Sequence, residues 1–242
     1  MKALFDAMCR DGAMKRIIES WHKTSGKTLI YGLAGTQKHA AIAAAWQSDP
    51  GVLAIIVHDR TSLASWRADL SEMLPDAIIE ELPQLDISAI QSVATSMERM
   101  AWRMEVLGRI DTGEPVIILA VADSAVQRDI SPVKFRDISL KLQPGDIMER
   151  DQLLHKLVAL GYSREDEVEN IGQFSERGGI VDMYPITAEH PVRLEFFDDE
   201  IDSLREFDEE TRRSIRNIDS VKVLPVLPED GSKEASFLSY IS

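Results

Sequence analysis

Apolar runs alternate with amphipathic stretches through the first half of the chain. Two runs of six apolar residues, Val52–Val57 and Val116–Val121, have the length and composition of strands buried on both faces of a sheet. The other elements predicted here are strands at Leu29–Tyr31 and Ile78–Ile79 and helices over Lys38–Gln47, from a cap at Thr61 or Ser62 to Pro75, and over Ser88–Gly108. Such repeated strand–helix units predict a parallel sheet.

After about Val126 the pattern changes to hairpins. A helix is predicted over Asp151–Leu160, with Gly161 beyond its end, and short strands at Leu140–Leu142 and Asp219–Val226. Turn residues separate two pairs of predicted strands: Gly178-Gly179 lies between 172–177 and 180–184, and Asp198-Asp199 between 192–197 and 200–207. The second half is therefore predicted to be an α+β domain with antiparallel hairpins.

Charge and composition exclude several classes of protein. The net charge is −14, whereas proteins that wrap nucleic acid carry clustered Lys and Arg, so no direct nucleic-acid binding is expected. The chain lacks an apolar run long enough for a membrane span, and no membrane partner is expected. The lone cysteine, Cys9, fits a reducing, cytoplasmic location, and the scattered histidines show no zinc spacing, so no metal is expected.

The segment Gly32–Ala40, GLAGTQKHA, stands where a phosphate-binding loop would, between a predicted strand and a predicted helix. Gln37 replaces the glycine that lets backbone N–H groups approach a phosphate, and His39 replaces the hydroxyl that binds Mg²⁺. No paired acidic metal ligands follow a core strand, and no other catalytic pattern occurs. We interpret the segment as a degenerate nucleotide loop without a cofactor, defined by Gly32, Gly35, Gln37, Lys38 and His39.

The predicted strand 192–197 places an aromatic residue on its polar face. Because side chains alternate along a strand, Val192, Leu194 and Phe196 share the core face, and Arg193, Glu195 and Phe197 share the other. An exposed Phe beside an Arg has the composition of an interface hot spot. Two alternatives stay open: a neighbouring loop covers Phe197, or Arg193 merely pairs with Glu195. Arg177, at the end of the preceding hairpin strand, could join this face.

The segment Gly161–Ile215 contains the phrases RGGIVDMYP and VRLEFFDDEIDSLREFD. It closely resembles the N-terminal region of bacterial transcription-repair-coupling factors and, more loosely, the excision-repair protein UvrB. The resemblance continues upstream through AVADSAVQRDISP (Ala120–Pro132) to the loop GLAGTQKHA, and so covers essentially the whole chain.

The resemblance implies a fold class and a domain organisation. Residues 1–126 would form domain 1A, an α/β domain with a helicase-like parallel sheet and a degenerate P-loop. Residues 127–218 would form domain 2, an inserted α+β domain, and 219–242 a segment returning to domain 1A with a remnant of domain 1B. The short connection between Val223-Leu224-Pro225 and Phe237 leaves the extent of domain 1B open.

The resemblance also implies a function. Domain 2 would be a non-catalytic docking module that recruits the damage-recognition ATPase UvrA, with Arg177, Arg193 and Phe197 as partner-binding residues. A nucleotide- or DNA-binding helicase-like domain is the alternative. In the family a C-terminal motor half covers this surface in the resting protein, and it would be a second partner. No motor motifs occur here, so we expect the chain to be part of a longer protein.

Overall fold

The computed structural model describes residues 5, 7–8, 10–21, 27–85, 93–226 and 235–241 of the 242-residue chain. By its internal contacts the chain divides into two compact units that interleave along the sequence. Unit 1 contains 1–82, 112–125 and 241, and unit 2 contains 83–111, 126–240 and 242. The predicted α/β class is confirmed, because unit 1 holds a parallel sheet and unit 2 holds antiparallel hairpins.

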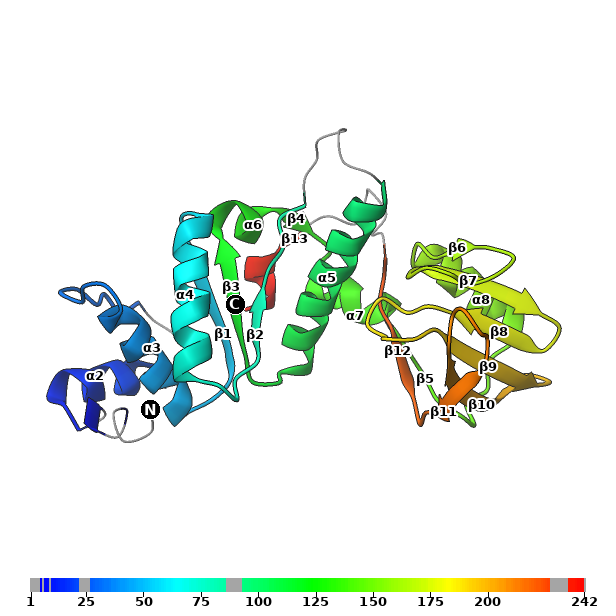
Figure 1. Ribbon diagram of the computed structural model, residues 1–242, viewed down its shortest axis with the longest axis horizontal. Coiled ribbons are helices and arrows are strands. Elements are labelled where there is room, and N and C mark those ends of the chain that lie inside the picture. Colours follow the sequence, from blue (N-terminus) through cyan, green and yellow to red (C-terminus); the bar gives the residue numbers. More distant parts are fainter. Residues whose placement is uncertain are drawn as a thin grey trace. The chain divides into compact units, whose positions relative to one another are not determined.

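Unit 1 is built on a three-stranded parallel sheet of order β1-β3-β2, with helix α4 over one face (Figure 1). Helix α3 packs against both α2 and α4. A continuous apolar core joins these helices to the sheet and includes Trp46, Trp66 and Leu70. The elements are α2 (Gly12–Trp21), α3 (Gln37–Ser48), β1 (Val52–Val57), α4 (Arg60–Met73), β2 (Ile79–Glu81), β3 (Val116–Val121) and the following α6 (Ala122–Val126).

The two six-residue apolar runs are strands with the predicted bounds, but only one is buried on both faces. Strand β3 is central, and its residues 116–120 are buried. Strand β1 is at the edge of the sheet, and Val52 and Ile56 on one of its faces are exposed. The prediction of two-sided burial is therefore wrong for β1, because one of its faces is left partly open to solvent.

The predicted strand Leu29–Tyr31 does not form. These residues have no regular secondary structure, and the side chains of Leu29 and Tyr31 are largely exposed. Strand propensity describes how well a side chain fits a sheet surface, so an apolar run without a paired neighbour does not become a strand.

Two helix ends differ from the prediction. Asp59, rather than Thr61 or Ser62, caps α4, since its carboxylate accepts a hydrogen bond from the backbone N–H of Ser62 at 2.7 Å. Helix α5 (Val93–Thr112) passes through Gly108 instead of ending there, and its predicted start at Ser88 lies outside the described residues. A Cβ on Gly108 would stand 2.9 Å from Leu224, so the glycine permits a close approach inside the helix.

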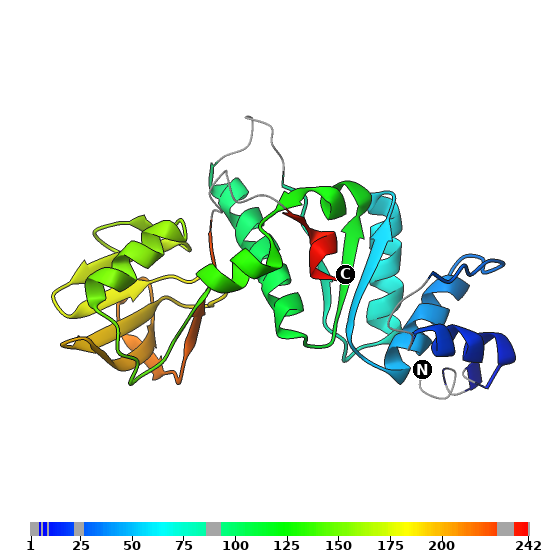
Figure 2. The same ribbon diagram turned by 180° about the vertical axis from the view of Figure 1, so that it is seen from behind.

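Unit 2 contains a six-stranded sheet of order β11-β10-β9-β8-β7-β6, with helix α8 across one face (Figure 2). All pairs are antiparallel except β6–β7. The two predicted hairpins form at Gly178-Gly179 and Asp198-Asp199. The elements of the sheet and its helix are α8 (Arg150–Ala159), β6 (Ser163–Arg164), β7 (Gln173–Arg177), β8 (Ile180–Met183), β9 (Val192–Phe197), β10 (Glu200–Phe207) and β11 (Ser214–Asn217).

Among the described residues, the rest of unit 2 consists of three helices, α5, α7 and η2, and two small two-stranded sheets. Strand β12 pairs with β5, and β13 pairs with β4. In β4, Asp129 forms a bidentate ion pair with the fully buried Arg103 of α5, with the closest contact at 2.6 Å. The further elements are β4 (Arg128–Asp129), α7 (Pro132–Ile138), β5 (Leu140–Leu142), β12 (Val221–Val223), β13 (Ala235–Ser236) and the 3-10 helix η2 (Phe237–Tyr240).

In the part of the chain that the structure describes, no helix is long and apolar enough to cross a membrane. The domain boundaries at 126 and 218 stay predictions.

Candidate partner-binding face

Strand register brings the predicted partner-binding residues onto one face of the six-stranded sheet. Directly opposite residues in antiparallel strands share a face. Arg193 lies opposite Asp182 of β8 and Arg205 of β10. The other opposite pairs on this face are Arg177 with Ile180, Ser175 with Asp182, Glu195 with Ile180 and Ser203, and Phe197 with Glu200. We call this the polar face of the sheet; α8 packs over the other face.

Phe197 is the exposed aromatic residue of the polar face. It ends β9 at the two-residue turn, where Asp198 takes a left-handed conformation with φ of 58°. Its side chain is 77% exposed, whereas Val192 and Leu194 on the opposite face are buried. The alternation predicted from the sequence is confirmed, and the alternative in which a loop covers Phe197 is wrong.

Arg193 is fixed inside the face. Its Nε and a terminal guanidinium nitrogen donate to the two carboxylate oxygens of Asp182, both at 2.7 Å. Its guanidinium also lies over the ring of Phe207, with Cζ 4.9 Å from the ring centroid. The hydrogen bonds to Asp182 raise the pKa of Arg193 above its ordinary value. The alternative pairing of Arg193 with Glu195 is wrong, because Glu195 pairs with Arg205 and accepts from the Ser203 hydroxyl.

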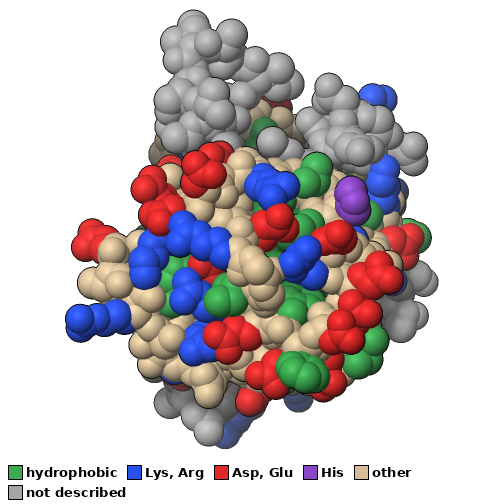
Figure 3. Space-filling view, turned by 90° about the vertical axis from the view of Figure 1, so that its right-hand side faces the viewer, with side chains coloured by type: hydrophobic (Ala, Val, Ile, Leu, Met, Phe, Trp, Pro, Cys, Tyr) green, Lys and Arg blue, Asp and Glu red, His purple; other side chains and the backbone are tan. Residues whose placement is uncertain are grey.

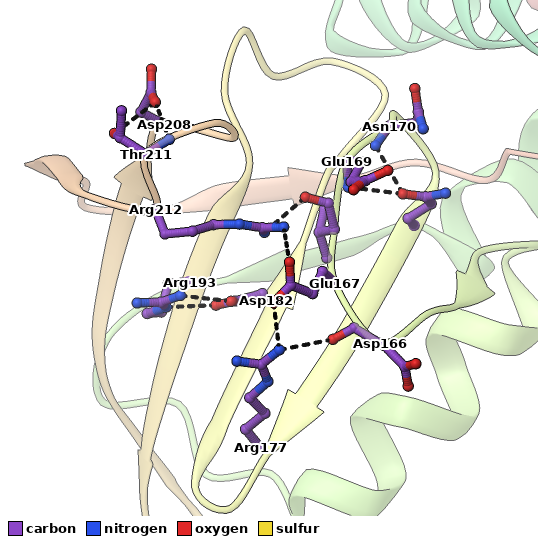
Figure 4. A network of polar contacts seen from close by, with 12 residues as sticks. Asp166, Glu167, Glu169, Asn170, Arg177, Asp182, Arg193, Asp208, Thr211 and Arg212 are labelled. Atoms are coloured by element: carbon purple, nitrogen blue, oxygen red, sulfur yellow. Dashed lines mark hydrogen bonds and ion pairs between the residues drawn. The ribbon is translucent and has the colours of Figure 1, made fainter.

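Arg177 lies at the margin of the same face and is more exposed. Its guanidinium donates to the Glu167 carboxylate at 2.9 Å and to the Asp166 carbonyl at 3.3 Å (Figure 4). Glu167 also accepts from Arg212, at 3.1 Å, and thus lies between two arginines. The hydrogen bond from Arg177 is the main reason that the pKa of Glu167 is lowered.

The loop between β6 and β7 therefore connects Arg177 and Arg212 at one end of the polar face, because Glu167 of this loop accepts hydrogen bonds from both. Arg212, whose φ is 59°, donates to the Val168 carbonyl at 2.9 Å, and its guanidinium lies 6.0 Å from the Phe207 ring centroid. Phe207 is consequently fully buried although it belongs to the polar face. A hollow of about 180 Å³ beside this network is lined by Ser175, Arg177, Ile180, Asp182 and Arg193.

Sequence reasoning missed the residues that hold the arginines. Asp182 lies in the phrase GGIVDMYP, and its alternation with the buried Val181 and Met183 could have placed it on the polar face. Glu167 belongs to an irregular loop, and no periodicity connects it to Arg177 or Arg212. Its position depends on how the loop closes over the sheet.

The surface of this end of unit 2 carries mixed charge. Lys and Arg side chains gather in one part of the view, acidic side chains lie both along the margin and among the basic ones, and single hydrophobic side chains lie between them (Figure 3). Mixed charge around isolated apolar groups is typical of the polar surroundings of a protein interface.

The loop Gly32–Ala40 has a different environment. His39 is buried: its Nδ1 lies 2.5 Å from the Asp69 carboxylate of α4, and its ring centroid is 3.9 Å from that of Trp66. Lys38 lies with Nζ 5.9 Å from the Trp66 ring centroid. The side chain of Gln37 accepts a hydrogen bond from the Ala34 N–H at 3.1 Å, so this backbone amide of the loop is not available to a ligand.

The glycines of this loop make its turn. Gly32 and Gly35 both have positive φ, 85° and 53°, and both are exposed. The interpretation as a degenerate nucleotide loop stays a prediction.

Comparison with known proteins identifies the class to which the second half is similar. Residues 140–227 match the UvrB interaction domain family. This range contains the whole polar face and its hairpins.

Known proteins are similar to this chain over most of its length. The chain is 34% identical to the transcription-repair-coupling factor of Bacillus subtilis over 213 residues, which is 87% of the chain. It is 33% identical to the Staphylococcus aureus and Staphylococcus epidermidis transcription-repair-coupling factors, each over 81% of its length. These findings confirm the resemblance inferred from residues 161–215. The chain spans 17 to 18% of the length of these relatives.

Proposed function

We propose that this chain is a non-catalytic docking module of a transcription-coupled DNA repair factor, and that it recruits UvrA through the polar face of β7–β10. The observation that carries the proposal is Phe197, which is 77% exposed on the same face as the paired charges of Arg193, Asp182, Glu195 and Arg205. The match of 140–227 to the UvrB interaction domain supports the same assignment.

Phe197 would supply much of the affinity. Aromatic anchors dominate interface energetics when they enter a pocket that excludes water, and truncating one costs about 2 kcal/mol or more. The hairpin fixes the backbone of Phe197 before binding, so less backbone entropy is lost on docking.

The two arginines would have different roles. Arg193 is held by Asp182 and Phe207 and keeps β8, β9 and β10 in register beside the anchor. Arg177 has an exposed ion pair with Glu167, and such pairs contribute little net energy, about 0 to 1 kcal/mol. An acidic group of UvrA could therefore replace Glu167 at Arg177 at small cost, which would fix the orientation of the partner.

The alternative, a nucleotide- or DNA-binding domain, finds less support. A phosphate loop needs free backbone amides and a hydroxyl, whereas Gln37 occupies an amide and His39 is in the core. The net charge of −14 also opposes binding to a polyanion.

Titration of purified UvrA with this chain tests the proposal. We expect saturable binding that Arg177→Ala weakens by roughly tenfold, within the range for a charged contact. Val158→Ser is the matched control, because Val158 is exposed on α8, over the opposite face of the sheet, and its substitution should leave the Kd unchanged. Absence of binding by the unaltered chain, together with a low-salt shift of duplex DNA, would favour the alternative.

A further inference from the structure

The segment before α8 runs alongside the hairpin of β9 and β10. Its backbone is paired to this hairpin by three hydrogen bonds: Gly145 N–H to the Ile201 carbonyl at 2.8 Å, Ile201 N–H to the Asp146 carbonyl at 3.0 Å, and Met148 N–H to the Asp199 carbonyl at 2.7 Å. Ile147 forms an antiparallel bridge with Glu200. The segment thus forms a short, strand-like extension of the sheet beside the hairpin tip.

This register places Ile147 on the polar face. Ile147 lies opposite Glu200, and Glu200 lies opposite Phe197, so the three side chains share one face. Two successive opposite pairs separate the Cβ atoms of Ile147 and Phe197 by about 9–11 Å. Ile147 is 75% exposed, nearly as much as Phe197. The hairpin tip therefore presents two large apolar side chains with a carboxylate between them.

The carboxylates around these side chains lack a basic partner. Within the described residues, the side chains of Asp198, Asp199, Glu200 and Asp202 form no ion pair, and all four are exposed. In contrast, the acidic residues at the other end of the face, Glu167 and Asp182, are paired with arginine.

We propose that Ile147 is a second apolar anchor of the docking surface, and that the partner offers a Lys or Arg to Glu200 between the two anchors. The inference rests on the proposed function, because it assigns further contacts to the same UvrA-binding face. Docking over both apolar side chains removes water from Glu200, and a buried carboxylate needs a cationic partner to offset its desolvation.

This arrangement defines the polarity of the partner surface. The partner carries an acidic group opposite Arg177 and a basic group opposite Glu200, at two ends of one patch. Opposite charges at separate points allow one orientation and oppose the reversed one, in which like charges would meet.

Equilibrium titration of UvrA with single variants of the chain tests the inference. We expect Ile147→Ser to raise the Kd by roughly tenfold, and Glu200→Lys to raise it by at least as much at low salt. Glu200→Gln should have a smaller effect than Glu200→Lys, and the difference between them should shrink as salt screens the charges. Val158→Ser controls for loss of an exposed apolar side chain, and a thermal melt should be unchanged for every variant.

The outcomes separate the two proposals. If Phe197→Ala weakens binding while Ile147→Ser binds like the unaltered chain, Ile147 is not an anchor and the docking function stands. Tighter binding by Glu200→Lys would show that the partner surface is acidic here and overturn the charge assignment. If neither Phe197→Ala nor Ile147→Ser changes the Kd, the docking function on this face fails as well.

Discussion

Two regions of this chain place a basic side chain over an aromatic ring, and they differ in what remains exposed to solvent. In the loop region, Lys38 lies over Trp66, Trp66 is buried, and the neighbouring His39 is buried with it. On the polar face, Arg193 covers Phe207 while Phe197 projects from the end of the same hairpin.

The difference separates a structural cluster from a binding site. Near the loop, two polar groups that a ligand could use are taken up by the protein itself: His39 Nδ1 by Asp69, and the Ala34 amide by Gln37. On the polar face, Arg193 and Asp182 are paired with each other, but the side chain of Phe197 remains exposed and available to a partner. A docking surface needs that combination of a fixed surrounding and an unsatisfied apolar group.

The largest loss of stability is expected from replacing Phe207, the aromatic residue that the two arginines cover. Phe207→Ala should lower the free energy of unfolding of unit 2 by about 3–5 kcal/mol, because the ring is fully buried under two guanidinium groups. Urea denaturation followed by circular dichroism measures this loss. Phe207→Leu retains most of the apolar volume and provides a folded reference if the alanine variant does not fold. A loss below 1 kcal/mol would mean that Phe207 is not a core residue.

A smaller effect is expected from the loop region. His39→Ala removes a buried hydrogen bond and leaves the Asp69 carboxylate without that donor, so unit 1 should lose about 1–3 kcal/mol of stability. Tryptophan fluorescence during urea unfolding reports mainly on this unit, since Trp46 and Trp66 are in its core and Trp21 packs against it, whereas Trp102 belongs to unit 2. The exposed neighbour Lys38, changed to Ala, should alter stability by less than about 0.5 kcal/mol. Equal effects at both positions would contradict the structural role of His39.

Nucleotide is expected to have no effect on the stability of unit 1. Binding at tenfold above Kd would stabilise unit 1 by about 1.4 kcal/mol. We expect millimolar ATP with Mg²⁺ to leave the unfolding midpoint of unit 1 unchanged, because Gln37 and His39 are unsuited to phosphate and Mg²⁺. A saturable rise in the midpoint that requires Mg²⁺ would show that the loop retains a nucleotide site and would remove the contrast between the two regions.

Local periodicity explains what could be predicted from the sequence. Alternation with period two requires only one strand, so the two faces of β9 followed from residues 192–197. Whether a loop covers Phe197 did not follow from them, and the structure shows the side chain exposed. The partner of Arg193 depends on the β8–β9 register, which the connection 184–191 sets, and the partner of Arg177 depends on an irregular loop. The prediction of a strand at Leu29–Tyr31 was wrong for a related reason, because a strand requires a neighbouring strand that its own residues do not specify.

Ile147 illustrates the same limit at the candidate site. It lies in a segment between β5 and α8 that has no periodic pattern, and only its bridge to Glu200 places it near Phe197. Contacts between segments more than 50 residues apart cannot be read from alternation within either segment.

The affinity of UvrA for the Phe197→Ala variant tests the docking surface most directly. We expect a rise in Kd of about 30-fold or more, corresponding to about 2 kcal/mol, with an unfolding midpoint equal to that of the unaltered chain because the side chain is exposed. An unchanged Kd for a folded Phe197→Ala variant would contradict the assignment of the polar face as the docking surface.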